Sequence, residues 1–133
     1  RQMCIRDSSQ SNYSILTLES TCGFLEAVCQ VNTNPCNEND CVEIKNLIAK
    51  PRDKGNGSGA AAIYEVTQHY PSQTILLTST KTAESFYSHL GFVPSNKNLW
   101  SCHTIDVLEL SGENLTKFTT YIYEKFNIIK ESH

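Results

Sequence analysis

One stretch decides the fold of this sequence: Lys54-Gly55-Asn56-Gly57-Ser58-Gly59-Ala60. Before it, the β-rich run of Cys41 to Ala49 predicts a strand. After it, the helical spacing of apolar residues in Ala60 to Tyr70 predicts a helix. Glycines let a backbone approach a ligand with its N–H groups turned inward, and a helix start adds unpaired N–H groups and a positive dipole end. The pattern indicates an anion site suited to phosphate, and a flexible surface loop is the alternative.

Two phosphate-binding motifs fit this stretch poorly. A P-loop needs Lys followed by Ser or Thr after its last glycine, whereas Ala60 and Ala61 stand there. The dinucleotide fingerprint is formally met by Gly55, Gly57 and Ala60. However, it requires an acidic residue at the end of the next strand, and the predicted strand Thr74 to Thr78 is followed by none.

The rest of the chain predicts a mixed α/β sheet in one layer with helices on its faces. The order is an antiparallel meander, then β-α-β-α-β-β, then a C-terminal helix. The expected strands are Tyr13 to Leu18, Phe24 to Val31, Cys41 to Ala49, Thr74 to Thr78, Phe92 to Trp100 and Cys102 to Leu110. The expected helices are Ala60 to Tyr70, Thr80 or Thr82 to Leu90, and Ser111 to Lys130.

The length of 133 residues is that of one domain, and 39% hydrophobic residues supply a core. The chain begins with Arg1 rather than Met, and Arg1 to Asn12 is rich in Ser and Gln without periodicity. We expect residues 1–12 to be a disordered leader that need not be native to the domain. The domain itself is expected at residues 13–110, and residues 111–133 as a helical extension.

The net charge and the length of the apolar runs argue against two classes of partner. Eleven basic and fourteen acidic residues give a net charge of −3 without a basic stripe, which argues against a nucleic-acid partner. Apolar runs are too short to span a membrane.

The six cysteines would permit three disulfides in a secreted chain, but their spacings match no zinc pattern. We expect no metal and free thiols in the cytoplasm, although Cys36 and Cys41 flank a turn and could pair.

Two segments resemble the GNAT superfamily of acyl-CoA-dependent N-acyltransferases. The first, residues 47–59, follows the family pattern Leu-x-Val-x-Pro, then Gln/Arg-x-x-Gly-x-Gly/Ala, with Lys54 at the Gln/Arg position. The second, residues 80–92, follows Asn-x-x-Ala-x-x-Phe-Tyr-x-x-x-Gly-Phe, with Thr80 at the Asn position. The resemblance covers Tyr13 to Leu110.

The resemblance implies an enzyme that moves an acetyl group from acetyl-CoA to an amine, on a small molecule or a protein. The pantetheine arm would lie along Leu47 to Ala49, and the pyrophosphate on Gly55 to Ala60. The residues implied to hold the cofactor are Leu47, Ile48, Ala49, Lys54, Gly55, Asn56, Gly57, Ser58, Gly59, Ala60 and Thr80.

The resemblance also implies catalytic roles. A thiol leaves more easily if protonated, and the Tyr87 phenol stands at the family's position for that acid. Glu43 stands where some members carry a general base, and a backbone N–H near Ile48, where the strand would bulge, would meet the oxyanion. From the residues alone, Tyr87 could instead be a core residue, and Glu43 an exposed strand residue.

Family members open with a strand and two helices that form one wall of the acceptor groove. Only twelve residues precede Tyr13, so we expect a chain truncated at its N-terminus. The alternative function is a non-catalytic acyl-CoA-binding or protein-interaction module on the same fold. Whether the chain forms a homodimer is left open by the sequence.

Overall fold

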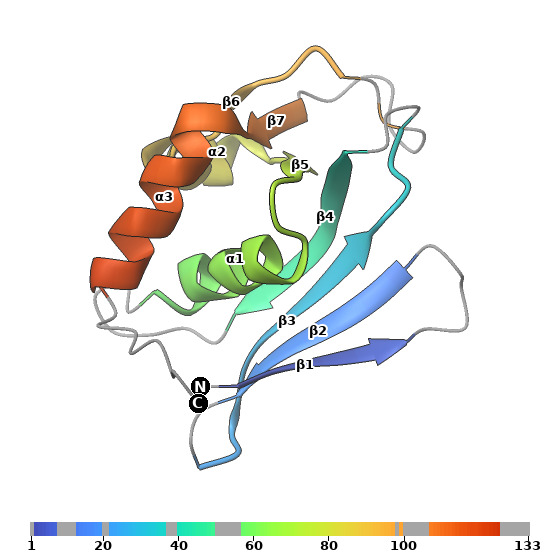
Figure 1. Cartoon of the computed structure of the whole chain (residues 1–133), viewed down its shortest axis with the longest axis vertical. Coiled ribbons are helices and arrows are strands. Elements are labelled where there is room, and N and C mark those ends of the chain that lie inside the picture. The colour runs from blue at the N-terminus through green and yellow to red at the C-terminus, as the bar shows by residue number, and fades with distance from the viewer. Residues whose placement is uncertain are drawn as a thin grey trace.

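The computed structural model describes residues 2–7, 13–19, 22–36, 40–49, 57–97, 99 and 107–125, with only the backbone for 2–7. The elements run β1 (Gln2–Asp7), β2 (Tyr13–Glu19), β3 (Leu25–Asn32), β4 (Cys41–Ala49), α1 (Ser58–His69), β5 (Thr74–Thr78), α2 (Lys81–Leu90), β6 (Val93–Pro94), β7 (Val107–Leu110) and α3 (Gly112–Lys125). Figure 1 shows α1 lying across the sheet with α3 beside it. No helix among these residues is long and apolar enough to cross a membrane.

The strands form one seven-stranded mixed sheet in the order β1-β2-β3-β4-β5-β7-β6. Neighbours from β1 to β4 are antiparallel, β4 and β5 are parallel, and β7 is antiparallel to both β5 and β6. A mixed α/β sheet with a meander, alternating helices and a C-terminal helix was predicted from the sequence, and it is confirmed.

Strands β4 and β5 pair over only part of their length. Their ladder runs from Cys41 opposite Thr74 to Ile44 opposite Leu77. Strand β4 then continues to Ala49, pairing with β3, whereas β5 ends at Thr78. The edge of β4 that faces β5 is therefore without a strand partner after Ile44 in the described ladder.

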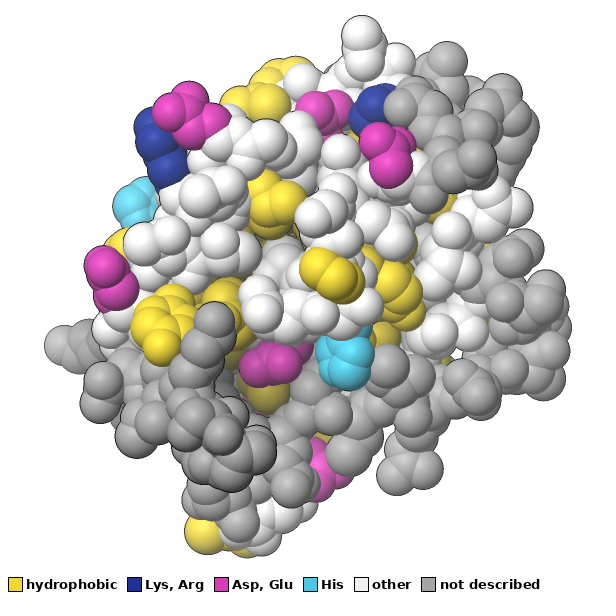
Figure 2. All heavy atoms as spheres, in the orientation of Figure 1, with side chains coloured by type: hydrophobic (Ala, Val, Ile, Leu, Met, Phe, Trp, Pro, Cys, Tyr) yellow, Lys and Arg dark blue, Asp and Glu magenta, His cyan; other side chains and the backbone are white. Residues whose placement is uncertain are grey.

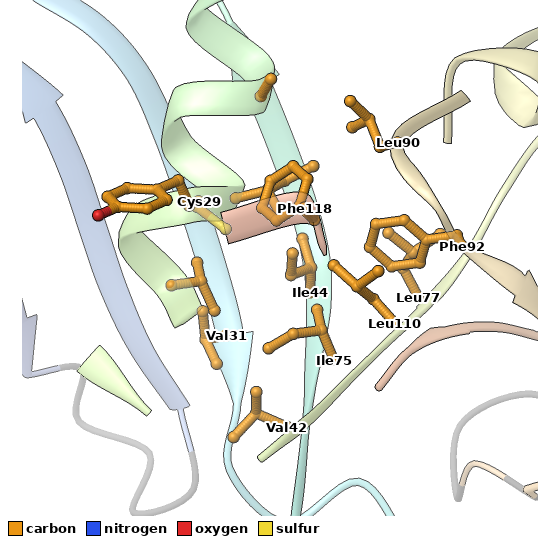
Figure 3. Packing of buried hydrophobic residues seen from close by; sticks show 14 of the residues in the cluster. Cys29, Val31, Val42, Ile44, Ile75, Leu77, Leu90, Phe92, Leu110 and Phe118 are labelled. Carbon is orange, nitrogen blue, oxygen red and sulfur yellow. The ribbon is translucent and has the colours of Figure 1, made fainter. Parts of the chain in front are cut away.

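The main core lies between the sheet and the helices α1 and α3 (Figure 3). Its members come from the strands β2, β3, β4, β5 and β7 and from all three helices. The fully buried ones include Leu16, Val31, Ile63, Val66, Ile75, Leu110, Phe118 and Ile122. On the face seen in Figure 1, hydrophobic side chains reach the surface in scattered patches among polar side chains and charges of both signs (Figure 2).

The predicted disordered leader is wrong over Gln2–Asp7, which forms β1. This strand pairs antiparallel with β2, from Gln2 opposite Glu19 to Asp7 opposite Ser14. The edge of β2 supplies the hydrogen-bonding partners, and strand formation depends on such neighbours more than on composition.

Two other expectations change at their boundaries. The strand pair expected over residues 92–110 consists of the short β6 and β7, and 98, 100–106 lie outside the described residues. The last five residues of the helix expected to end at Lys130 also lie outside them.

The link between β1 and β2 is short. It contains five residues, 8–12, which is too few for two helices. The pair of helices that the resemblance implies after a first strand therefore does not separate β1 from β2.

Two neighbouring residues of α3 test this packing. Ile122 is buried (1% exposed), so Ile122→Ala should lower the free energy of unfolding by about 2–5 kcal/mol. Tyr121 is 45% exposed, with the Lys125 ammonium 5.5 Å from its ring centroid. Tyr121→Ala should cost about 1 kcal/mol or less. Urea unfolding of both variants measures the difference, and equal losses would show that α3 does not pack as described.

Candidate active site

The start of α1 is built around a glycine in the left-handed region. Gly57 has φ +91° and precedes the first helical residue, and its carbonyl accepts the first helical bond from Ala61 N–H at 2.8 Å. Only glycine adopts this φ without strain, and it has no side chain to cap the first turn. The N–H groups of this turn and the helix dipole therefore suit an external anion.

The structure describes most of the predicted cofactor residues, but not all of them. Lys54, Gly55 and Asn56 lie outside the described residues. Gly57 to Ala60 form the N-cap and first turn of α1, and Leu47 to Ala49 end β4.

These two segments meet. A Cβ placed on Gly59 would lie 3.9 Å from Ala49 Cβ and 3.6 Å from Phe86 of α2. The first turn of α1 therefore packs against α2 and against the end of β4 that extends beyond its ladder with β5. Thr80 has a structural role nearby, since it caps α2 by accepting a hydrogen bond from Ala83 N–H at 3.3 Å.

Tyr87 lies on α2 and packs against the main core. Its ring makes edge contacts with Phe86 and Phe92, at centroid distances of 5.1 and 5.6 Å. Burial raises the pKa of its phenol, and the neighbouring Cys29 thiol raises it further. Cys29 is the cross-strand partner of Leu47. The protonated phenol thus lies near the part of β4 that has no β5 partner.

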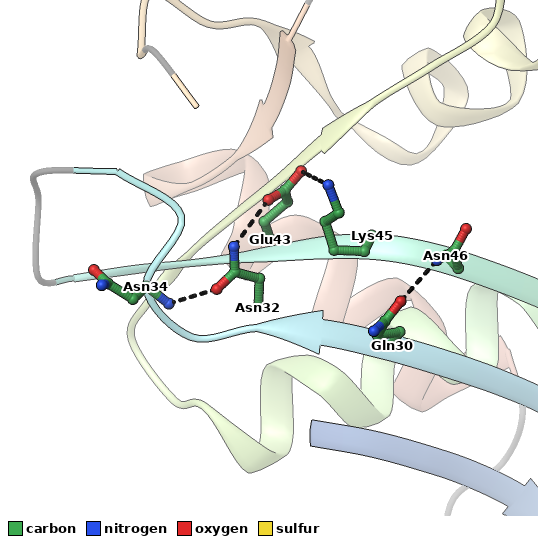
Figure 4. Close-up of polar contacts among 6 residues, drawn as sticks. All are labelled: Gln30, Asn32, Asn34, Glu43, Lys45 and Asn46. Atoms are coloured by element: carbon green, nitrogen blue, oxygen red, sulfur yellow. Dashed lines mark hydrogen bonds and ion pairs between the residues drawn. The ribbon is translucent and has the colours of Figure 1, made fainter. Parts of the chain in front are cut away.

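Glu43 lies in β4 and is only 2% exposed. Its carboxylate accepts a hydrogen bond from Asn32 Nδ2 at 3.4 Å and pairs with Lys45 Nζ at 3.8 Å (Figure 4). Asn34 N–H donates to Asn32 Oδ1 at 2.9 Å, which orients the amide. Burial raises the pKa of the Glu43 carboxyl, and Lys45 and Asn32 oppose part of that rise. The alternative prediction, that Glu43 is an exposed strand residue, is therefore wrong.

The bulge in β4 is not where the sequence placed it. Ile44 and Asn46 pair with consecutive residues of β3, so Lys45 is the extra residue. Ile48, near which the bulge was expected, pairs in regular register with Val28. Because a bulge re-aims the side chains that follow it, this one sets which face each later residue of β4 occupies.

Comparisons with known proteins were made by sequence and by structure. No protein-family model matches the sequence, and no curated protein does. Among solved structures, Tetrahymena GCN5 is 10% identical with a TM-score of 0.60, and the match covers 75% of this chain and 68% of that one. The chain has the fold of the GNAT acyltransferases.

Two further neighbours carry the same fold. A chimera of the Vibrio cholerae spermidine N-acetyltransferase SpeG and hSSAT is 14% identical with a TM-score of 0.55, covering 76% of this chain and 66% of that one. A Corynebacterium glutamicum protein described as histone acetyltransferase HPA2 and related acetyltransferase is 16% identical with a TM-score of 0.50, covering 74% and 64%. This chain spans 64–68% of the length of the three neighbours.

Within this GNAT fold, Tyr87 and Glu43 lie on opposite faces of the sheet. Side chains alternate between faces along a strand, and Val42 and Ile44 belong to the core beneath α1, so Glu43 points to the other face. After the bulge, Leu47 packs on the α1 side again, where Tyr87 packs too. The structure does not bring the two candidate catalytic residues together on one face of the sheet.

A buried carboxylate that the sequence did not single out lies beside the start of α1. Glu26 is the bulged residue of β3, since Leu18 and Glu19 pair with Ala27 and Leu25. It is 4% exposed and accepts a hydrogen bond from Ser58 Oγ at 3.4 Å. A carboxylate here interacts favourably with the helix dipole. No local signal marks it, because a glutamate in a strand ordinarily indicates the exposed face.

The burial of Glu43 predicts a particular pH dependence of stability. Its folded pKa is raised above 4.5, so the folded state binds the proton more tightly than the unfolded state. The stability this gives is fully present below about pH 4.5 and is lost as the pH rises through the folded pKa, at up to about 1.4 kcal/mol per pH unit. Glu43→Gln should remove this slope, as measured by urea unfolding from pH 4 to 8.

Lys45→Gln is the matched variant. It removes one of the two groups that lower the pKa of Glu43, so the loss of stability should extend to higher pH than in the wild type. Parallel curves for the wild type and Glu43→Gln would contradict a buried Glu43.

Proposed function

We propose that the chain transfers an acetyl group from acetyl-CoA to an amine. The observation that carries this proposal is the end of the β4–β5 ladder at Ile44 and Leu77, beyond which β4 runs on to meet the glycine-capped start of α1. Unpaired strand backbone suits the amides of the pantetheine arm, and the helix start suits the pyrophosphate. The acetyltransferase names of two of the neighbours support the same chemistry.

In the proposed complex, the pyrophosphate is bound by N–H groups from Gly55 to Ala60, with Lys54 as a nearby cation. The pantetheine arm lies along Leu47 to Ala49, and Thr80 closes the site where β5 ends. Ile48, with its side chain 72% exposed, is covered when the ligand and acceptor are bound.

The proposed reaction uses the two faces of the sheet separately. Glu43 takes a proton from the acceptor ammonium, and the freed amine attacks the thioester carbonyl. A backbone N–H near Ile48 meets the oxyanion, and the carbon–sulfur bond then breaks. Tyr87 protonates the departing thiolate. The raised pKa of each group suits its role, because Glu43 holds a proton more strongly and Tyr87 stays protonated.

The acceptor is proposed to be a primary amine on a small molecule or a protein. One neighbour is named for spermidine and another for histone, and both names describe amine acceptors. We also propose a cytoplasmic location, which is supported by Cys22, Cys29, Cys36 and Cys41 not being joined in disulfides. The net charge of −3 supports a partner other than nucleic acid.

A second candidate is an acyl-CoA-binding or protein-interaction module without catalysis. The observation that favours it is the five-residue link between β1 and β2, which leaves no helices there to wall an acceptor groove. Acetyl-CoA binding without turnover on any amine would support this candidate.

Binding can be tested by thermal unfolding. At about 100 times its Kd, acetyl-CoA should stabilise the chain by about 2.7 kcal/mol, roughly 10 °C in Tm. Gly57→Glu should abolish this shift, since it adds a negative side chain where the pyrophosphate is proposed to bind.

Gly112→Glu is the matched control. Gly112 also has a positive φ, +56°, at the start of a helix, and it lies beside Thr67 and Gln68 near the other end of α1. Both variants carry backbone strain and an added charge, but only Gly112→Glu should keep the shift. A full shift in Gly57→Glu would place the binding site elsewhere.

Catalysis can be tested with Tyr87→Phe, which keeps the ring contacts with Phe86 and Phe92 and removes only the hydroxyl. A general acid contributes ~10²–10⁴-fold in rate, so kcat for CoA release with a panel of primary amines should fall by that factor. Loss of one uncharged hydrogen bond costs about 0.5–1.5 kcal/mol, so acetyl-CoA affinity should change by about tenfold at most. A fall in kcat of less than about threefold would show that Tyr87 is a core residue and not the proton donor.

A further inference from the structure

Two buried thiols meet where the chain enters β4. Cys36 Sγ and Cys41 Sγ are 3.2 Å apart, and the residues are 5% and 1% exposed. They belong to a small apolar cluster with Leu76, Leu99 and Val107, separate from the core beneath α1. We propose that Cys36 and Cys41 are a redox-active dithiol that a small-molecule disulfide oxidises to an intrachain disulfide, which displaces the start of β4 and the Glu43 carboxylate.

The Cys41 side of the contact is held by β5. Cys41 is the first residue of β4 and pairs with Thr74 of β5. The Thr74 N–H also donates to Asp40 O at 2.9 Å, just before Cys41. The two sulfurs must approach by about 1 Å to reach the ~2.05 Å of a disulfide bond. The pair is therefore preorganised, and the bond requires a small movement rather than a rearrangement.

The chemistry balances with a disulfide such as oxidised glutathione. The thiolate of Cys36, the more exposed of the two, attacks one sulfur of the oxidant and releases one reduced thiol. The Cys41 thiol loses its proton and attacks the mixed disulfide, releasing the second reduced thiol. Two electrons pass from the cysteine pair to the oxidant, and the two cysteine protons end on the released thiols.

Strand geometry connects the dithiol to Glu43. Cys41 and Glu43 are two residues apart on β4, so their side chains lie on the same face. Glu43 pairs with Asn32 at the end of β3, and Cys36 follows that end by four residues. A bond between Cys36 and Cys41 therefore pulls on both strands that hold the Glu43–Asn32 hydrogen bond.

Cys22 and Cys29, the other cysteines whose side chains the structure describes, have different surroundings. Cys29 lies in the core beneath α1, where burial raises the pKa of its thiol to about 12. Cys22 is exposed. Cys22 is therefore the matched control: it is an exposed thiol outside the Cys36–Cys41 pair.

The experiment treats the folded chain with mixtures of reduced and oxidised glutathione, quenches with iodoacetamide, and maps peptides by mass spectrometry. The wild type and Cys22→Ser should show a 36–41 disulfide with the loss of about 2 Da, and Cys36→Ala should not. Mixed glutathione disulfides alone, or equal oxidation in Cys36→Ala, would overturn the dithiol. Mapping the wild type gives this result even if Cys36→Ala folds poorly.

A second measurement tests the connection to Glu43. Closing the short loop should raise Tm by roughly 5 °C. Oxidation should also change the pH at which the stability slope due to Glu43 appears, compared with the reduced chain and with oxidised Glu43→Gln. A disulfide that leaves this slope unchanged would overturn the displacement of Glu43. Neither measurement uses acetyl-CoA, so the outcome is independent of the proposed function.

Discussion

The parallel pairing of β4 with β5 is the constraint on which the rest of the structure depends. It joins an antiparallel meander to the helical half of the chain, and it stops at Ile44 and Leu77. Because β5 turns into α2 while β4 runs on under α1, the end of β4, the first turn of α1 and the side of α2 come together. A longer ladder would engage the backbone groups at that end of β4 in strand hydrogen bonds. The candidate site is therefore a consequence of where one pairing ends.

The Lys45 bulge adds the second element of the arrangement. It lies immediately after the paired segment and reverses the faces of the residues that follow. Glu43, which precedes the bulge, is buried on one face beside Asn32, while Leu47 returns to the face that Tyr87 approaches. In the proposed reaction, the base and the acid act from opposite sides of the sheet, on the acceptor and on the leaving thiol.

The sequence predicted what local patterns determine and missed what distant pairings determine. The bounds of α2 follow from the Thr80 cap and from Gly91 with φ +110°, both visible as residue types. The glycines before α1 likewise marked its start. Strand β1 was missed because its partners are in β2, and the bulge was misplaced because register is a property of two strands. The burial of Glu43 and Glu26 depends on neighbours 11 and 32 residues away, which no local pattern encodes.

The central claim is that acetyl-CoA binds along the end of β4 beyond Ile44, beside the start of α1. Amide hydrogen exchange of the full chain with and without acetyl-CoA tests it most directly. The account predicts slower exchange in Leu47 to Ala49 and in Ser58 to Ala60, with β2 unchanged. Protection confined to the hollow between α2 and α3, lined by His89, Lys117 and Tyr121, would contradict it, as would unchanged exchange at saturating acetyl-CoA.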